Sequence, residues 1–153
     1  MVDSIQVEEV FDRVWVAVTK KLTGLDIIQT DSKEWSGKNA LVETIYTSGK
    51  FDAYILCEMD MELYEHIISS MYGKGIPSEE EKILYLNEYI NIICGRAVSV
   101  INNATGYASR LSVPVFYRSI EEFEGVEPKA EQKTLLYQTE KGFMRIVINY
   151  TFQ

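Results

Sequence analysis

A glutamate and an asparagine three positions apart, Glu88 and Asn91, are the residues of this sequence best placed to do chemistry together. Positions i and i+3 of an α-helix project from the same side, so a helix would bring this carboxylate and amide together. The carboxylate can pair with a cation, and the amide can both accept and donate hydrogen bonds. The pair is either a working surface or the solvent-exposed side of a structural helix.

The segment around this pair carries the signals of one long helix. Ser78 and Glu81 have the S-x-x-E spacing of a capping box, which predicts the helix start. The helix can run to about Ala104, and Thr105-Gly106 predicts its end. Seven apolar residues fall in one stripe at helical spacing and predict the core face: Ile83, Leu86, Ile90, Ile93, Cys94, Ala97 and Ile101.

The polar pair belongs to a different side of this helix. That side contains Glu88, Asn91, Gly95 and Asn102, with Leu84 and Val98 beside them. A glycine inside a helix costs roughly 1 kcal/mol relative to alanine, so Gly95 needs a reason. Close helix packing is one reason, and the approach of a partner's backbone is the other. A four-residue E-x-x-N pattern also arises by chance, so an unrelated α+β domain remains an alternative.

The rest of the chain alternates helical and strand patterns. Before the long helix, apolar spacing and turn residues predict a helix at 4–22 before Gly24, a strand at 25–30, a polar turn at 31–39, a hairpin at 40–59, and a short helix capped by Asp60 and ending at Gly73. After it, they predict a strand at 110–118, an acidic loop at 121–131, and a hairpin of 133–139 and 143–152. Pro114, inside the strand at 110–118, suggests a sheet edge or a bulge. This order predicts an α+β fold with a largely antiparallel sheet packed against long helices, in a single domain spanning 1–153.

Composition and charge exclude several classes of function. The net charge of −8, from 15 basic and 23 acidic residues, argues against nucleic acid as a partner. No apolar run reaches about 18 residues, so we expect no membrane insertion. The acidic N-terminus lacks the basic start of a signal peptide, which favours a cytoplasmic protein.

The usual metal-binding and redox residues are sparse. Cys57 and Cys94 lie far apart in apolar surroundings and are expected to be buried, reduced thiols. His66 is the only histidine, and no second histidine or paired cysteine accompanies it. We therefore expect no metal site and interpret His66 as a surface or partly buried side chain.

The sequence resembles the CheC/CheX/FliY family of chemotaxis phosphatases, and within it the CheX branch. The E-x-x-N signature of that family matches Glu88-Tyr89-Ile90-Asn91, and the N-x-x-x-G continuation matches Asn91 to Gly95. Downstream, LSVPVFY at 111–117 looks like the apolar strand with a central proline that follows this helix. The chain has a single E-x-x-N, which is the CheX pattern of one active site per chain.

This resemblance implies a phosphatase that hydrolyses the aspartyl phosphate of a CheY-like receiver domain. It implies that Asn91 orients the attacking water and that Glu88 docks against a receiver lysine, while Gly95 lets the receiver surface approach. It implies no cofactor of the chain's own, because the Mg²⁺ belongs to the receiver.

One position departs from the family pattern. Leu84 stands where many relatives carry Asp or Ser four residues before the glutamate. This favours an alternative, a non-catalytic CheX-like module in which Leu84 contributes to binding receivers or other signalling proteins.

The resemblance also implies a homodimer that pairs through sheet edges. The chain offers a separate reason, because the arms 40–47, 51–59 and 143–152 are long and apolar. We expect at least one of them to lie at a sheet edge, where an exposed apolar strand invites pairing with a second chain.

Overall fold

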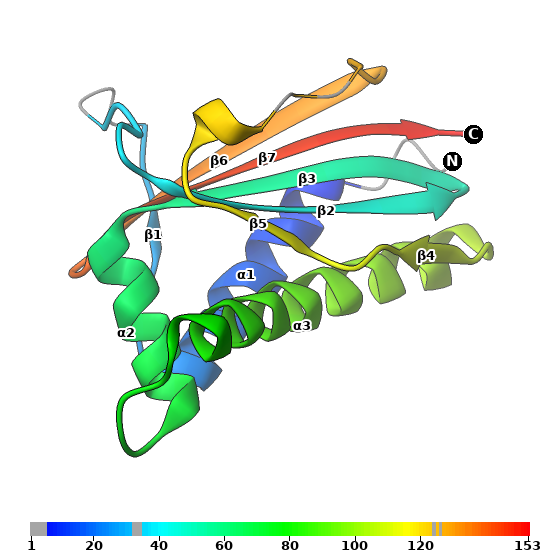
Figure 1. Ribbon diagram of the computed structural model, residues 1–153. Helices are drawn as coiled ribbons and strands as arrows, with labels where there is room; N and C mark the ends of the chain where they lie inside the picture. Colours follow the sequence, from blue (N-terminus) through cyan, green and yellow to red (C-terminus); the bar gives the residue numbers. More distant parts are fainter. Residues whose placement is uncertain (1–5, 32–34, 124, 126) are drawn as a thin grey trace.

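The computed structural model describes residues 6–31, 35–123, 125 and 127–153. The described residues form three α-helices, one short 3₁₀ helix and seven strands, and every strand pair is antiparallel (Figure 1). The helices are α1 (Val7–Thr23), α2 (Met61–Tyr72), α3 (Glu79–Thr105) and the 3₁₀ helix η2 (Ile120–Glu122). The strands are β1 (Ile28–Gln29), β2 (Leu41–Gly49), β3 (Phe51–Met59), β4 (Ser109–Leu111), β5 (Val115–Tyr117), β6 (Glu131–Thr139) and β7 (Gly142–Phe152). The predicted α+β class is confirmed.

Some sequence predictions reach outside the described residues. They are the first two residues of the helix predicted at 4–22, three residues of the polar turn and two of the acidic loop. The predicted strand at 25–30 is wrong in length, because only Ile28–Gln29 pairs, with Gln138 and Tyr137 of β6.

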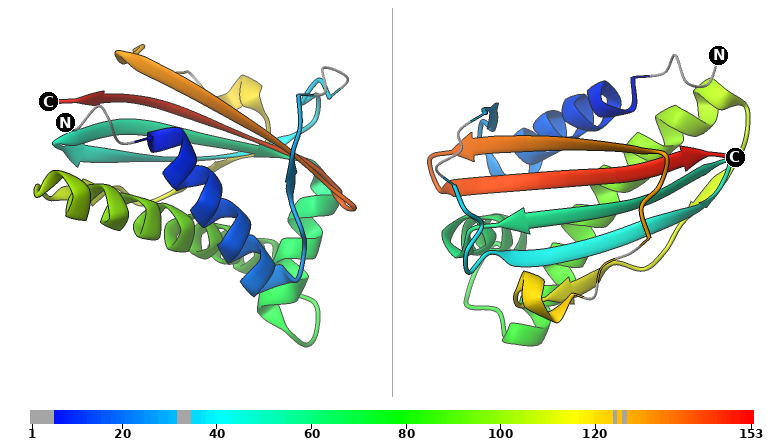
Figure 2. Two further views of the ribbon diagram at one scale, coloured as in Figure 1. Left: turned by 180° about the vertical axis from the view of Figure 1, so that it is seen from behind. Right: turned by 90° about the horizontal axis from the view of Figure 1, so that it is seen from above.

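The order of the strands places the two hairpins side by side. The sheet runs β1-β6-β7-β3-β2-β4, and β5 also pairs with β2 (Figure 2). The expectation that an arm at 40–47, 51–59 or 143–152 lies at a sheet edge is wrong. Each of these arms has a strand on both sides within the described sheet, because β4 and β5 cover the outer side of β2.

The strand predicted at 110–118 is divided at Pro114, which lies at both an edge and a bulge. Between the pairs Thr47–Leu111 and Thr44–Val115, β2 advances by three residues and the opposite segment by four. The extra residue makes this a β-bulge. Pro114 lacks a backbone N–H and cannot donate to the ladder, so it fits where pairing is interrupted.

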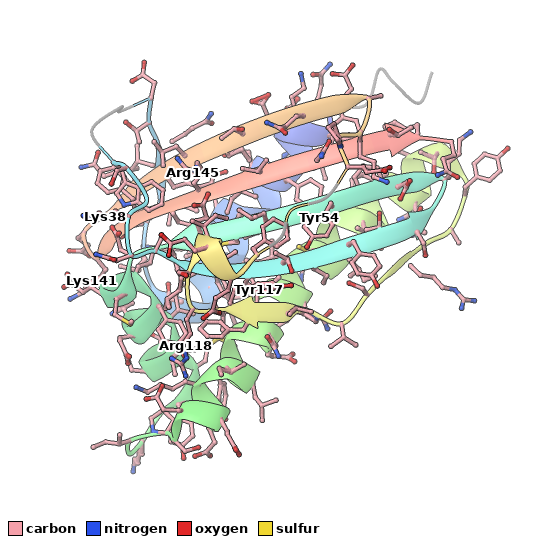
Figure 3. All side chains as sticks on the ribbon, turned by 45° about the horizontal axis from the view of Figure 1, so that its top comes forward. Lys38, Tyr54, Tyr117, Arg118, Lys141 and Arg145 are labelled. Carbon is pink, nitrogen blue, oxygen red and sulfur yellow. The ribbon has the colours of Figure 1, made fainter. Side chains whose placement is uncertain are left out.

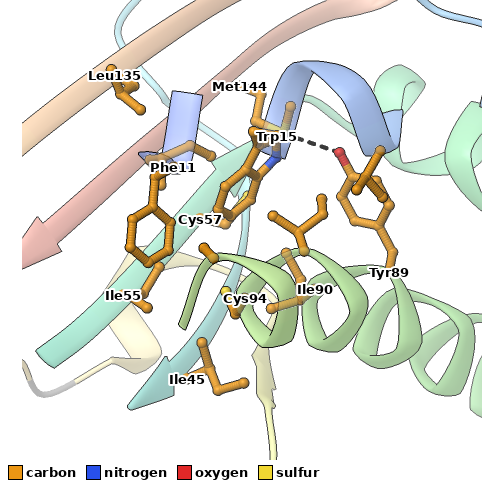
Figure 4. Close-up of a cluster of buried hydrophobic side chains, with 14 of the residues drawn as sticks. Phe11, Trp15, Ile45, Ile55, Cys57, Tyr89, Ile90, Cys94, Leu135 and Met144 are labelled. Carbon is orange, nitrogen blue, oxygen red and sulfur yellow. Dashed lines mark hydrogen bonds between the residues drawn. The ribbon is translucent and has the colours of Figure 1, made fainter. Parts of the chain in front are cut away.

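The core lies between the sheet and the helices. Figure 4 shows Phe11 and Trp15 of α1 and Tyr89 of α3 packed over strand residues. The buried Tyr89 hydroxyl lies 2.7 Å from Thr19 Oγ1 and so links the two long helices. The predicted core stripe of α3 is buried except for Ile83, which is half-buried, and Val98 is also buried.

The opposite face of the sheet is covered by side-chain contacts. Figure 3 shows Arg145 and Tyr54 on this face. Arg145 donates to both carboxylate oxygens of Glu58, at 2.9 and 3.0 Å, and its guanidinium lies over the Trp35 ring. Tyr54 stacks on Phe123, which follows η2. The helix face and the outer face are thus both occupied over the middle of the sheet.

Asp60 has a different role from the one predicted. It occupies the N-cap position of α2, but its side chain makes no cap hydrogen bond. Its carboxylate instead accepts hydrogen bonds from Trp35 Nε1 at 2.9 Å and from the backbone N–H of Phe143 at 2.8 Å. The side chain therefore ties the segment before β2 to the start of β7.

Candidate functional site

The helix that carries the polar pair begins and ends where the sequence predicts. At its start, Ser78 Oγ accepts from the backbone N–H of Glu81, and the Glu81 carboxylate accepts from the backbone N–H of Ser78. The hydrogen bond from the Ser78 backbone to its carboxylate lowers the pKa of Glu81. At its end, Gly106 adopts φ +77° and closes the last turn on Asn102. The two caps fix where α3 begins and ends, and its buried apolar stripe fixes which side chains face out.

Glu88 and Asn91 line one groove. Its volume is about 320 Å³, and α3 forms one side of it with Leu84, Asn87, Glu88 and Asn91. The segment from Leu111 to Pro114 forms the other side, running alongside α3 between β4 and β5 (Figures 1 and 2). Three of the four predicted site residues, Leu84, Glu88 and Asn91, are therefore neighbours in space.

The side chains of this pair are unengaged. Glu88 and Asn91 are exposed, and neither makes a side-chain hydrogen bond or ion pair with another described residue. Both are therefore available to an external ligand, with the carboxylate supplying a negative charge and the amide a donor and an acceptor.

Asn87 is a groove residue that the sequence analysis did not single out. It is half-buried, and its Oδ1 atom is buried without a hydrogen-bond partner among the described residues. The available signal was its spacing, because positions 87 and 91 are one helical turn apart and share a side of α3.

Gly95, the fourth predicted site residue, lies at the end of this surface. A Cβ built on it would meet only Leu111 Cδ1, at 3.8 Å, which is ordinary van der Waals contact. Packing within the chain therefore leaves room for an alanine and does not require the glycine. Leu84, 64% exposed, is an apolar side chain left on the surface beside the polar pair.

A buried carboxyl group lies on the helix-facing side of the sheet. Glu43 of β2 is 1% exposed, and neither of its carboxylate oxygens has a hydrogen-bond partner among the described residues. Burial raises its pKa to about 8.

Cys57 and Cys94 are free and buried, as predicted, and burial raises the pKa of both thiols.

The described residues hold no group of three or more His, Cys, Asp or Glu side chains suited to a metal ion. His66 is half-buried, and its Nε2 lies 3.3 Å from the backbone oxygen of Thr23, where α2 meets the end of α1. Among all the residues that the structure describes, no helix is both long and apolar enough to span a bilayer.

A family model described as "Chemotaxis phosphatase CheX" matches residues 41–136, which is more than half of the chain and includes the whole groove. The chain belongs to the CheX family. A comparison with curated proteins gave no match.

Solved CheX structures have the same fold. CheX from Vibrio vulnificus is 15% identical, with a TM-score of 0.77 over 96% of this chain and 97% of that one. CheX from Desulfovibrio desulfuricans is 14% identical, with a TM-score of 0.76 over 96% and 100%. A Borrelia burgdorferi complex of CheX with CheY, BeF3 and Mg²⁺ gives 16% identity and a TM-score of 0.72 over 95% and 98%. At these identities the likeness establishes the fold.

Proposed function

We propose that this CheX-family chain is a phosphatase that hydrolyses the aspartyl phosphate of a CheY-like receiver domain. The observation that carries the proposal is the exposed Glu88–Asn91 pair, unengaged within the described chain and lining one groove. Membership of a chemotaxis phosphatase family supports it. The Borrelia burgdorferi complex, in which a CheX protein of the same fold is bound to CheY, supports the choice of partner.

Asn91 orients the attacking water in this mechanism. An aspartyl phosphate is an activated acyl phosphate, so the reaction needs a water held in line with phosphorus more than it needs a nucleophile from the protein. The carbonyl of Asn91 accepts a hydrogen bond from that water, while its NH₂ group can donate to a phosphoryl oxygen. Attack by the water oxygen breaks the bond between phosphorus and the aspartyl oxygen, and releases inorganic phosphate and a free carboxylate.

Glu88 docks the receiver. One helical turn from Asn91, its carboxylate pairs with a receiver lysine near the phosphate, in a charge-assisted hydrogen bond that fixes α3 in register. Gly95 lets the receiver surface approach closely, since no side chain projects there. The chain needs no cofactor of its own, because the Mg²⁺ that balances the phosphate charge belongs to the receiver. The proposed partner also places the reaction in the cytoplasm.

A second candidate function is a non-catalytic module that binds receivers without hydrolysing their phosphate. The observation that favours it is Leu84, an exposed apolar side chain that lines the groove four residues before Glu88. An apolar contact there adds to binding without contributing to catalysis.

One experiment separates the two functions. Each receiver of the host is phosphorylated, and loss of its phosphate is followed with and without the protein at a small fraction of the receiver concentration. A phosphatase accelerates the decay of at least one receiver over many turnovers. Unchanged decay of every receiver, combined with measurable binding to one of them, would establish the binding module instead.

We also propose a homodimer that pairs through β6. Only Gln138 and Tyr137 of this strand pair with β1, and Thr30 donates to the carbonyl of Leu136. The outer side of 131–135 has no partner strand among the described residues. An open edge of this length can take a second copy of itself in antiparallel pairing, and two-fold pairing is the commonest oligomeric arrangement.

A further inference from the structure

The groove has a second wall that the E-x-x-N motif does not include. It is the segment Ser112-Val113-Pro114, where the bulge shifts pairing with β2 by one residue. Bulges of this kind occur at sheet edges and beside active sites, and they change the direction of a side chain.

Ser112 fixes this wall to the sheet. Its backbone N–H donates to the carbonyl of Tyr46 at 2.8 Å, and its hydroxyl accepts from the backbone N–H of Tyr46 at 2.9 Å. The side chain thus replaces a backbone partner that the bulge removes. Val113 is the next residue, so its position is set by the two hydrogen bonds that join Ser112 to Tyr46.

Val113 is 78% exposed, more than any other apolar residue that lines the groove. It lies in the connection between β4 and β5, outside both strands, and its β-branched apolar side chain is left in solvent. Leu84, 64% exposed, stands on the opposite, α3 side of the same groove. The charged and amide groups of Glu88 and Asn91 are therefore flanked by two exposed apolar side chains.

We propose that Val113 is an apolar anchor for the receiver domain and, with Leu84, determines which receivers dock. The inference rests on the proposed function for the identity of the partner. Asn91 can position a water only if the reacting phosphorus comes within about 3–3.5 Å of that water. A receiver that brings its phosphate so far into the groove must contact the opposite wall. The receivers selected are those with an apolar side chain beside the phosphorylation site, which Val113 can cover.

The test uses the full chain and a beryllofluoride-activated receiver, so that binding is measured apart from turnover. Val113→Ser should raise the Kd about tenfold, as loss of an anchor residue does. It should raise KM by a similar factor and leave kcat near its wild-type value. Val113→Leu, which keeps an apolar side chain, should bind within about twofold of wild type.

Val100→Ser is the matched control. Val100 is also exposed on α3, at 45%, but nine positions after Asn91 it lies on the opposite side of the helix. This variant should bind as wild type does. Val113 is too exposed to support the core, so Val113→Ser should unfold at the wild-type temperature.

The outcomes distinguish the inference from the function. If Val113→Ser and Val100→Ser bind the receiver equally well, Val113 is no anchor, although the phosphatase proposal stands. If the wild type binds a receiver but does not dephosphorylate it, the phosphatase proposal fails and the Kd values still decide the role of Val113. If the wild type binds no receiver, both proposals fall.

Discussion

At the scale of single residues, the proposed function gives the chemistry to Asn91 and the docking to Glu88. We expect Asn91→Ala to lower kcat by on the order of 10²-fold, as the loss of other positioned polar groups does. The Kd for an activated receiver should change little, because docking rests mainly on Glu88. Single-turnover decay of the phosphorylated receiver measures the first quantity, and titration measures the second. Wild-type turnover in this variant would refute the assigned mechanism.

For Glu88, the decisive variant keeps the shape of the side chain and removes its negative charge. Glu88→Gln should raise the Kd and make binding less sensitive to salt, because an ion pair with a receiver lysine is lost. Glu80→Gln is the matched control, since Glu80 is an exposed glutamate at the start of the same helix, outside the groove. Equal losses in both variants would point to net charge and not to a specific contact.

Glu43 makes the stability of the fold depend on pH. Its folded-state pKa of about 8 is above the ordinary value of 4.5, because burial penalises the carboxylate. Between these two values the unfolded chain binds fewer protons than the folded chain. The free energy of unfolding should therefore fall as pH rises across this window, by up to about 1.4 kcal/mol per pH unit, and the contribution should level off on either side.

Glu43→Gln should remove this contribution. The variant cannot release a proton from position 43, so its stability relative to wild type should grow steadily from pH 5 to pH 8. Urea unfolding of both proteins at several pH values within that range measures the difference. Two curves that stay parallel over the whole range would show that the Glu43 carboxyl titrates normally.

At the scale of elements, α3 tolerates an unfavourable residue on the side that carries Glu88 and Asn91. Gly95 lowers the stability of the helix, yet a Cβ there would meet only Leu111 at an ordinary distance. We expect Gly95→Ala to raise the free energy of unfolding by roughly 1 kcal/mol. The same change should weaken receiver binding, because the added methyl group projects toward the docked surface.

Denaturation and titration on the same preparation separate these two effects. A more stable variant with unchanged receiver binding would show that no partner approaches Gly95. A less stable variant would instead reveal a packing requirement around Leu111 that the 3.8 Å contact does not predict.

At the scale of the whole molecule, the open part of β6 is the proposed dimer contact. Light scattering should give about 35 kDa, twice the chain mass of 17.6 kDa. The backbone carbonyl of Leu136 points to the outer side of β6, where it accepts from Thr30. Backbone groups of an antiparallel strand point to the same side at every second residue, so the N–H and C=O of Thr134 also point outward. Thr134→Pro removes an outward N–H without affecting pairing with β7, and should give a monomer.

Thr134→Val is the control, since it keeps the backbone N–H and should remain dimeric. A wild-type chain that scatters as a 17.6 kDa monomer at micromolar concentration rules out the proposed pairing. A dimer that Thr134→Pro leaves intact would place the contact elsewhere.

The sequence by itself determined the features that depend on short-range interactions. The capping box at Ser78 and the glycine at 106 fixed both ends of α3, and helical periodicity placed Glu88 and Asn91 on an exposed side. The turns at 49–50 and 141–142 defined the two hairpins. Each of these signals involves residues within a few positions of one another, so it can be read without knowing what packs around them.

Only the tertiary structure decided which segments become neighbours. The hairpin arms are similarly apolar, and nothing local in them indicates that β4 and β5 will cover β2. Nor does it indicate that the outer side of 131–135 in β6 will have no partner strand among the described residues. The second wall of the groove and the burial of Glu43 depend on pairings between segments more than 60 residues apart, Thr47 with Leu111 and Glu43 with Phe116. Such pairings reflect the competition among all strands for hydrogen-bonding partners, and that competition is settled only when the whole sheet forms.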